Sequence, residues 1–546
     1  MKYSILTLSG PYRETGPLVP SPVFSRRGAQ FRFDHFLIRI EKLLSIRRIR
    51  KVLIVCKRDF QPGLIGGAEA VCEQLIRLSG AGKETFFYAA EYGPVQLYLA
   101  SACAVRMIHP LGSFSFLGLS RSFLFFRNAA DKMGIDSTVI RRGRYKSAGD
   151  RFRTDHLDPW TRRQYGEYFG EVQMQLKKQI LAGTGKEESD LQELLDGRVL
   201  QAEEAKNEGW VDQIKTAAQL QREWKKEKAR PHTIKNPGKS FGRGRKKIAV
   251  LVFEGLIIDG TSKRDPLLGQ AVGSDSFIRH IHKLTDDSAV KGVVLRVNSG
   301  GGSATASEDI LSALLELGNK KPLVVSMSGL AASGGYWISC CAERLFAPAA
   351  CLTGSIGVIT LSFAVGKFLE RYGITTETLK TGPYADFGSA LRPLDEKERH
   401  ILERSVETLY EKFLTKVSGF RGIEKRDLEK LAGGRVWSGV SAVQNHLADE
   451  IGGLSRALDY LRTKTEFKNA KIVFYPRTKP SLLERVIRSS VEVSGIFNEK
   501  AGFHNLRYFD GAIKPVEGLM KEGLSGQPVF DSRVPLVLLP ETGIGD

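Results

Sequence analysis

The residues with the clearest chemical potential are a serine and two glycine-rich turns in the second half of the chain. Ser333 lies in the run Ala-Ala-Ser-Gly-Gly (331–335), whose small neighbours leave room for a substrate backbone to approach the hydroxyl. The run Asn-Ser-Gly-Gly-Gly-Ser (298–303) can turn backbone N–H groups toward an oxyanion or a phosphate, but it lacks the Gly-Lys-Ser/Thr ending of a P-loop. These residues indicate nucleophilic catalysis; the alternative is that Ser333 only caps the helix that follows.

A serine nucleophile needs a base before it can attack at neutral pH. No serine lies in the Gly-x-Ser-x-Gly pattern of the α/β-hydrolases, and the nine histidines have no distinctive setting. A buried lysine can serve instead, because burial lowers its pKa and allows the neutral amine to exist. The local sequence leaves the identity of the base open.

A tandem repeat organises the chain that must position these groups. Three matches keep their order and nearly the same spacing: 197–199 with 434–436 (434 − 197 = 237), 106–110 with 344–348 (344 − 106 = 238), and 143–145 with 382–384 (382 − 143 = 239). A nearly constant shift over more than a hundred residues indicates a duplication.

Each copy alternates apolar strand-like runs with amphipathic helical stretches. In the first copy, 51–55 is predicted to be a strand and 68–78 a helix; in the second, the corresponding predictions are 290–297 and 307–317. A further strand is predicted to end near Met327, before the serine. This succession predicts an α/β fold with mostly parallel strands.

The predicted organisation has five parts. They are an N-terminal extension (1–34), the first copy (35–220), a basic linker (221–247), the second copy (248–465) and a C-terminal extension (466–546). Lysine and arginine exceed aspartate and glutamate by 20, so a non-enzymatic protein that binds anionic lipid or nucleic acid is one alternative. Basic and aromatic residues are not interleaved and no nucleic-acid motif is present, so we expect no nucleic-acid partner.

Hydropathy and cysteine spacing restrict the class further. The sequence has neither a long uninterrupted apolar run nor a basic start followed by an apolar core, so we expect no transmembrane anchor and no secretory signal. We therefore expect a protein that is cytoplasmic or peripheral to the membrane. The six cysteines are not spaced as Cys-x-x-Cys, which argues against a zinc site or a disulfide framework.

At this point the chain resembles the signal peptide peptidase A family, also called protease IV, in its long, duplicated form. The matching motifs lie at 143–150, 296–303, 331–337, 352–358 and 434–439. The resemblance implies the fold of Clp protease and crotonase, built from repeated β-β-α turns. It also implies a Ser–Lys peptidase that needs no metal or cofactor, acts on apolar peptides such as signal-peptide remnants, and assembles as a homo-oligomer, most simply a tetramer.

The same resemblance assigns roles to residues of this chain. It makes Ser333 the nucleophile, Lys146 the general base, Ser355 the hydroxyl that orients the lysine, and the amides of Gly302 and Gly334 the oxyanion hole. The family usually has proline where this chain has Gly300, so we expect a more flexible oxyanion loop.

The duplication offers a check that uses this sequence alone. The position matching Lys146 in the second copy is Ala385 (146 + 239 = 385), and the position matching Ser333 in the first copy is Val95 (333 − 238 = 95). Each copy lacks what the other has, so the predicted site must be assembled across the two copies.

A crotonase-like acyl-CoA hydratase or isomerase is the second alternative. Its glycine-based oxyanion hole would polarise a thioester, while carboxylates would do the acid–base work. No glutamate near Gly302 or Gly334 in the sequence obviously fits that role.

Overall fold

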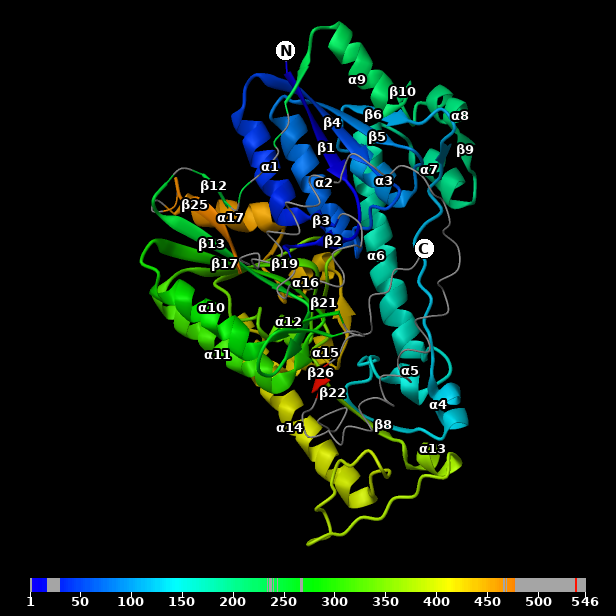
Figure 1. Ribbon diagram of the computed structural model, residues 1–546, viewed down its shortest axis with the longest axis vertical. Coiled ribbons are helices and arrows are strands. Elements are labelled where there is room, and N and C mark those ends of the chain that lie inside the picture. The colour runs from blue at the N-terminus through cyan, green and yellow to red at the C-terminus, as the bar shows by residue number, and fades with distance from the viewer. Residues whose placement is uncertain are drawn as a thin grey trace.

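The computed structural model describes residues 2–16, 30–232, 244–265, 269–464, 469–476 and 536–537, together with residues 234, 238, 240–242 and 467. It contains two α/β units, one from each copy of the repeat, and the long helix α6 (Pro159–Thr184) runs alongside both (Figure 1). Within the described ranges, no helix is long and apolar enough to cross a lipid bilayer.

Six parallel strands form the sheet of the first unit, in the order β10-β6-β5-β4-β1-β11. The strands are β1 (Lys2–Leu8), β4 (Ile49–Cys56), β5 (Glu84–Ala89), β6 (Val105–Ile108), β10 (Gln213–Ile214) and β11 (Arg230–Pro231). The helices of this unit include α1 (Phe33–Ser45), α2 (Ile65–Gly80), α3 (Pro94–Ala100), α7 (Glu188–Leu195), α8 (Ala202–Asn207) and α9 (Ala217–Lys226). The strand predicted at 51–55 and the helix predicted at 68–78 lie within β4 and α2, so both predictions are confirmed.

The second unit has a larger sheet, in the order β12-β25-β13-β17-β19-β20-β24, with β21 and β23 attached to the end of β19. The strands are β12 (Ser240–Phe241), β13 (Lys247–Glu254), β17 (Val290–Ser299), β19 (Leu323–Ala332), β20 (Arg344–Ala347), β21 (Leu352–Gly354), β23 (Val436–Trp437), β24 (Glu450–Ile451) and β25 (Lys471–Tyr475). The helices are α10 (Ser274–Asp286), α11 (Ala304–Lys320), α12 (Gly334–Trp337), α14 (Glu396–Arg421), α15 (Lys425–Leu431), α16 (Gly439–Gln444) and α17 (Leu454–Thr463). The strand and helix predicted at 290–297 and 307–317 are confirmed as parts of β17 and α11.

The two sheets have matching strand orders, as a duplication requires. The parallel series β1-β4-β5-β6-β10 of the first unit corresponds to β13-β17-β19-β20-β24 of the second. The remaining short elements are β2 (Tyr12–Arg13), β3 (Phe31–Arg32), β7 (Ser113–Phe114), β9 (Leu200–Gln201), α4 (Arg127–Met133), α5 (Asp150–Arg153) and α13 (Gly366–Arg371). The predicted α/β fold with a tandem duplication is confirmed.

The structure differs from the predicted division at two boundaries. β1 lies within the predicted extension 1–34, yet it pairs with β4 along its whole length. β25 lies within the predicted extension 466–546, yet it pairs with β13. Sheet membership depends on partners distant in the sequence, which local composition does not reveal. We therefore propose that the first unit begins at β1 and that the second includes β25, with the basic linker 221–247 between them. Apart from 467, 469–476 and 536–537, the predicted C-terminal extension lies outside the described residues.

Strand β19 continues past Met327, where the strand was predicted to end, and reaches Ala332. It pairs with β17 and β20 in its first half and with β21 in its last residues. Ser328 and Gly329 resemble a strand terminator in sequence, but here they serve packing between the units. A Cβ on Gly66 of α2 would lie 2.6 Å from the Cα of Gly329. The strand therefore leads directly to Ser333.

A two-stranded antiparallel ribbon joins the two units close to Lys146. β8 (Asp136–Arg142) comes from the first unit and pairs over its full length with β22 (Val358–Ala364) of the second. A further small sheet, in the order β15-β16-β14-β18-β26, lies at the other side of the glycine-rich turn. Its strands are β14 (Leu256–Ile258), β15 (Lys263–Asp265), β16 (Gly269–Gly273), β18 (Gly302–Ser303) and β26 (Leu536–Val537).

One large hydrophobic cluster extends over both units. Alternate residues of β13 face opposite sides of the sheet: Leu251 and Phe253 pack with α10, α11 and α14. Val250 and Val252 belong instead to a cluster that includes buried residues of α1 and α2 from the first unit. The first unit therefore covers one face of the second unit's sheet, and the relative position of the copies is set by close packing.

A buried ion pair also crosses this contact. Arg296 of β17 donates from Nε and Nη2 to the Glu14 carboxylate, at 3.1 Å each, and both side chains are at most 1% exposed. Arg296 Nη1 also donates to the hydroxyl of Ser326 at 2.9 Å. Removing one member of a buried pair leaves an uncompensated charge, which typically costs about 3–5 kcal/mol.

We therefore predict that Arg296→Met strongly destabilises the protein, by about 3–5 kcal/mol, because Glu14 stays buried without its cation. The shift in the urea-denaturation midpoint measures this loss. Arg58→Met is the matched control, since the Arg58–Glu91 pair is 71% and 48% exposed and such pairs contribute about 1 kcal/mol or less. Equal shifts for the two variants would contradict the structural role assigned to the buried pair.

Candidate active site

Ser333 occupies the sharp turn between β19 and α12. Its backbone has φ +57° and ψ −122°, in a region that residues with side chains seldom adopt. The amide of Ser333 donates to the carbonyl of Gly354 at 2.8 Å, which holds the turn against β21. The side chain makes no cap hydrogen bond with α12, so the alternative role of helix cap is excluded. The Ser333 hydroxyl is left to point at another partner.

That partner is Lys146, from the first unit. Lys146 follows β8, and its amide closes a turn onto the carbonyl of Gly143 at 3.2 Å. Its Nζ lies 2.7 Å from Ser333 Oγ, 2.9 Å from the Ser355 carbonyl oxygen and 3.0 Å from Ser355 Oγ. The three side chains are at most 2% exposed. The structure thus brings together the serine, the lysine and the lysine-orienting hydroxyl that the sequence predicted.

Burial sets the protonation state of this lysine. Desolvation lowers the pKa of Lys146 from 10.5 to about 7, because the charged ammonium loses its hydration in this environment. A neutral amine has two N–H groups and one lone pair. The two oxygens of Ser355 can accept from the N–H groups, which leaves the lone pair free to accept from the Ser333 hydroxyl. The arrangement therefore suits proton abstraction from serine.

The two predicted oxyanion-hole glycines lie next to this pair. Gly334 follows Ser333 directly, and a Cβ at this position would lie 3.1 Å from the Cα of Gly301. Gly302 has φ +151°, and a Cβ on it would lie 2.0 Å from the carbonyl oxygen of Ile257. Only glycine fits at such a close approach of backbones. The two glycine-rich turns are therefore packed against each other beside the serine.

Two hydrogen bonds hold the turn around Gly300, for which we expected greater flexibility. The Ser299 hydroxyl donates to the carbonyl of Gly255 at 2.7 Å and accepts from the amide of Gly301 at 3.1 Å. Ser299 is buried, and these contacts brace the turn on both sides of Gly300. The glycine-rich turn 298–303 thus has side-chain support from Ser299.

Glycines also allow the loop 433–436 to press against the lysine segment. A Cβ on Gly434 would lie 2.5 Å from both the N and the Cβ of Lys146. The amide of Tyr145 donates to the carbonyl of Gly433 at 3.0 Å. The sequence analysis had marked Gly434 as part of the repeat and of a family motif but gave it no role, so its close contact with Lys146 is a feature that sequence reasoning missed.

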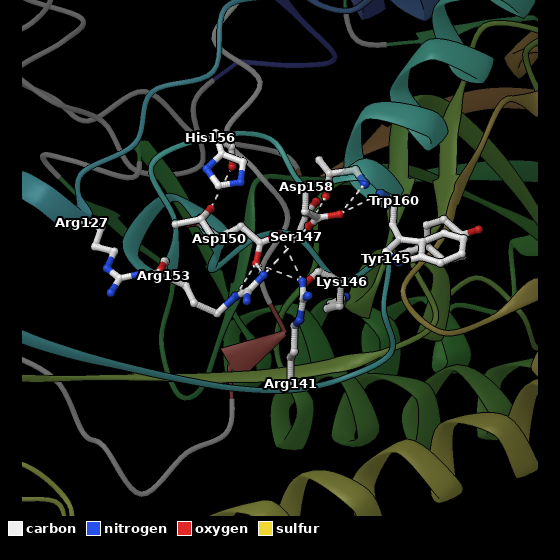
Figure 2. Close-up of polar contacts among 12 residues, drawn as sticks. Arg127, Arg141, Tyr145, Lys146, Ser147, Asp150, Arg153, His156, Asp158 and Trp160 are labelled. Atoms are coloured by element: carbon white, nitrogen blue, oxygen red, sulfur yellow. Dashed lines mark hydrogen bonds and ion pairs between the residues drawn. The ribbon is translucent and has the colours of Figure 1, made fainter.

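An ionic cluster holds the chain that follows Lys146. Figure 2 shows Arg141 and Arg153 converging on Asp150, which they contact at 2.9 Å each. Arg141 Nη1 also donates to the carbonyl of Lys146 at 3.1 Å. The Asp150 carboxylate is buried, and the two guanidinium groups offset the cost of burying it. The lysine backbone is thereby restrained from its carbonyl side.

The corresponding positions in the other copy have no such chemistry. Ala385 closes the same turn as Lys146, with its amide 3.2 Å from the carbonyl of Gly382, but it is exposed to solvent. Val95 lies at the start of α3.

The described residues contain no group of three or more His, Cys, Asp or Glu side chains able to hold a metal ion. All six cysteines are free thiols.

Comparison with known proteins identifies the family to which this geometry belongs. The profile of Peptidase family S49 matches the chain twice, over residues 78–230 and 316–468. The chain belongs to Peptidase family S49. It is a serine peptidase, and the two matches fall in the two copies of the repeat.

Relatives of the S49 peptidase extend over most of its length. "Protease 4" of Haemophilus influenzae is 30% identical over 84% of this chain and 76% of its own. "Serine protease SPPA, chloroplastic" of Arabidopsis thaliana is 28% identical over 85% of this chain and 72% of its own. Among solved structures, a ClpP1 mutant from Listeria monocytogenes is 15% identical and covers 37% of this chain and 91% of its own, with a TM-score of 0.26. The predicted resemblance to the protease IV family is confirmed.

The close contact at Gly434 gives a testable prediction. Gly434→Ala would push the Lys146 backbone away, so we expect the labelling rate of Ser333 with a fluorophosphonate to fall about a hundredfold, as for a displacement of about 1 Å. Gly433→Ala is the matched control, because its φ of +65° is similarly unfavourable but its Cβ would meet only Gly143 Cα at 3.8 Å. Equal labelling rates in the two variants would show that contact with Lys146 does not matter.

Proposed function

We propose that this S49 peptidase is an endopeptidase whose Ser–Lys dyad is assembled from the two copies. The observation that supports the proposal best is the 2.7 Å approach of Lys146 Nζ to Ser333 Oγ in a fully buried setting. The lowered pKa of Lys146 fits a general base at neutral pH. Ser355 orients the amine, and the amides of Gly302 and Gly334 stabilise the oxyanion.

In the acylation step, the Ser333 oxygen attacks the peptide carbonyl carbon while its proton passes to Lys146. The carbonyl oxygen becomes an oxyanion, and donors placed for it typically contribute about 3–4 kcal/mol each to transition-state stabilisation. The C–N bond then breaks, and the protonated Lys146 gives its proton to the leaving amine. The products of this step are a free amine and an ester on Ser333.

In the deacylation step, Lys146 takes a proton from water as the water oxygen attacks the ester carbonyl. The C–O bond to Ser333 breaks, and the serine oxygen recovers a proton from Lys146. The second peptide product leaves with a carboxyl group. The two steps regenerate the enzyme and consume one water molecule per peptide bond cleaved.

We propose apolar peptides, such as signal-peptide remnants, as the substrates. The support comes from a relative named "Putative signal peptide peptidase SppA" of Enterococcus faecium, which is 33% identical over 43% of this chain and 68% of its own. A peripheral contact with the membrane would bring the enzyme to such peptides, and nucleic acid has no part in this proposal.

We also propose a homo-oligomer, most simply a tetramer. Residues 372–385 of the second copy correspond in the repeat to residues 133–146, which we call the Lys146 arm. This second-copy segment exposes Leu379 at 95% and Tyr372 at 68%. At the matching positions of the first copy, Ile140 (379 − 239 = 140) is 6% exposed and Met133 (372 − 239 = 133) is 36% exposed. The apolar side chains that residues 372–379 leave exposed need a partner, and a further copy of the chain is the natural candidate.

The first test removes the dyad. We expect Ser333→Ala and Lys146→Met each to lower kcat by at least about 10³-fold, in the range seen for members of a catalytic unit. Cleavage of a quenched fluorescent peptide with an apolar core measures the rate. Lys178→Met, at an exposed position on α6, should keep full activity. Near-complete activity in either dyad variant overturns the proposal.

The second test is the pH dependence of kcat/KM. The pKa of Lys146 is about 7, and only the neutral amine accepts the serine proton. We therefore expect kcat/KM to fall about tenfold per pH unit below pH 7 and to level off above it. Measurement with the same peptide from about pH 5 to about pH 9 gives the inflection. An inflection near 10.5, the ordinary value for lysine, would mean that the base is not desolvated.

A further inference from the structure

Helix α6 presents a polar stripe to the second unit. Four residues at spacings of three and four lie on one side of this helix. The stripe is Gln164, Glu167, Tyr168 and Glu171. Glu167 pairs with Arg435, Glu171 accepts from the hydroxyls of Ser438 and Ser441, and the Tyr168 hydroxyl donates to the carbonyl of Ala350. The stripe therefore ties the first unit to the loop that seats the lysine.

Gln164 differs from the rest of the stripe because it bridges two backbones at the site. Its Nε2 donates to the carbonyl of Tyr145 at 3.0 Å, and its Oε1 accepts from the amide of Val436 at 3.1 Å. Gln164 is 1% exposed. One end thus holds the residue before Lys146, and the other end holds the loop whose Gly434 touches Lys146.

We propose that Gln164 is a positioning residue that fixes the depth of the Lys146 amine between the two units. This inference rests on the proposed function, in which Lys146 is the base. The primary amide suits the task because it supplies one donor and one acceptor at its two ends. An apolar replacement would leave the buried amide of Val436 without a partner, which is costly.

The two hydrogen bonds of Gln164 restrain Lys146 through two separate segments, the residue before the lysine and the loop that packs against it. The Tyr145 carbonyl belongs to the peptide unit that carries the Lys146 amide, so a shift there moves the lysine Cα directly. The Val436 amide follows Gly434 by two residues, so a shift there opens the space into which Lys146 is packed. Without the bridge, we expect the amine to sit less deeply and more hydrated, and its pKa to move back toward the ordinary value.

The test compares Gln164→Met with Gln179→Met in the full chain. Gln179 is on the same helix, and its Nε2 donates to Ser101 Oγ at 3.3 Å within the first unit. We expect Gln164→Met to lower kcat about 10- to 100-fold with KM changed less than about twofold, as for a misplaced catalytic group. We also expect the inflection of kcat/KM to move to higher pH. Gln179→Met should leave both unchanged.

Gln164→Glu keeps nearly the same shape and provides the second variant if Gln164→Met does not fold. Its carboxylate can accept from the amide of Val436 but cannot donate to the carbonyl of Tyr145, so kcat should fall above neutral pH. Rates are referred to the active fraction titrated with a fluorophosphonate, which removes losses due to unfolding. A Gln164 variant with unchanged kcat and pH profile overturns the inference.

The outcome separates this inference from the proposed function. If Lys146→Met is inactive while the Gln164 variants behave like the parent protein, only the positioning role fails. If Lys146→Met stays active, the dyad itself fails, whatever the Gln164 variants do. A drop in thermal stability of Gln164→Met without any change in the pH inflection would assign Gln164 to the fold alone and would also overturn the proposal.

Discussion

The proposed catalytic site depends on an amine that can lose its proton inside the protein near neutral pH. An ammonium group is strongly hydrated, and its neutral form is favoured only where water is excluded. The structure excludes water from Lys146 by burying it between two units that share a hydrophobic core. In the proposed mechanism the tight fit between the copies is part of the chemistry, because a looser interface would admit water and favour the charged amine.

Several features away from the serine serve this same exclusion. The ribbon of β8 and β22 carries the lysine arm onto the second unit, and the glycines at 433 and 434 let the opposing loop approach the lysine backbone. The Glu14–Arg296 pair fixes the contact at a greater distance from the reaction. The ribbon and the glycine loop join the units through backbone contacts, and the Glu14–Arg296 pair joins them through opposite charges. A buried polar group without a partner would destabilise the interface instead.

Much of this arrangement could be predicted from the sequence, and the exceptions have a common cause. Ser333, Lys146 and Ser355 were identified from motifs, and the absence of a lysine at 385 already required a site shared between the copies. Gln164 carries no comparable local signal. A glutamine within a helix is common, and the proposed role of Gln164 depends on its hydrogen bond with the amide of Val436, 272 positions away. β1 and β25 were likewise placed by long-range pairing that composition does not encode.

The division of the proposed dyad between the copies also constrains how the gene can change. Lys146 and Ser333 are 187 positions apart, whereas matching positions of the two copies are about 238 residues apart. Recombination between the copies deletes one full period, and every such deletion removes the lysine, the serine or both. A shortened descendant of this kind would keep one period of the repeat but would have lost at least one member of the proposed dyad, so the proposed reaction depends on both copies.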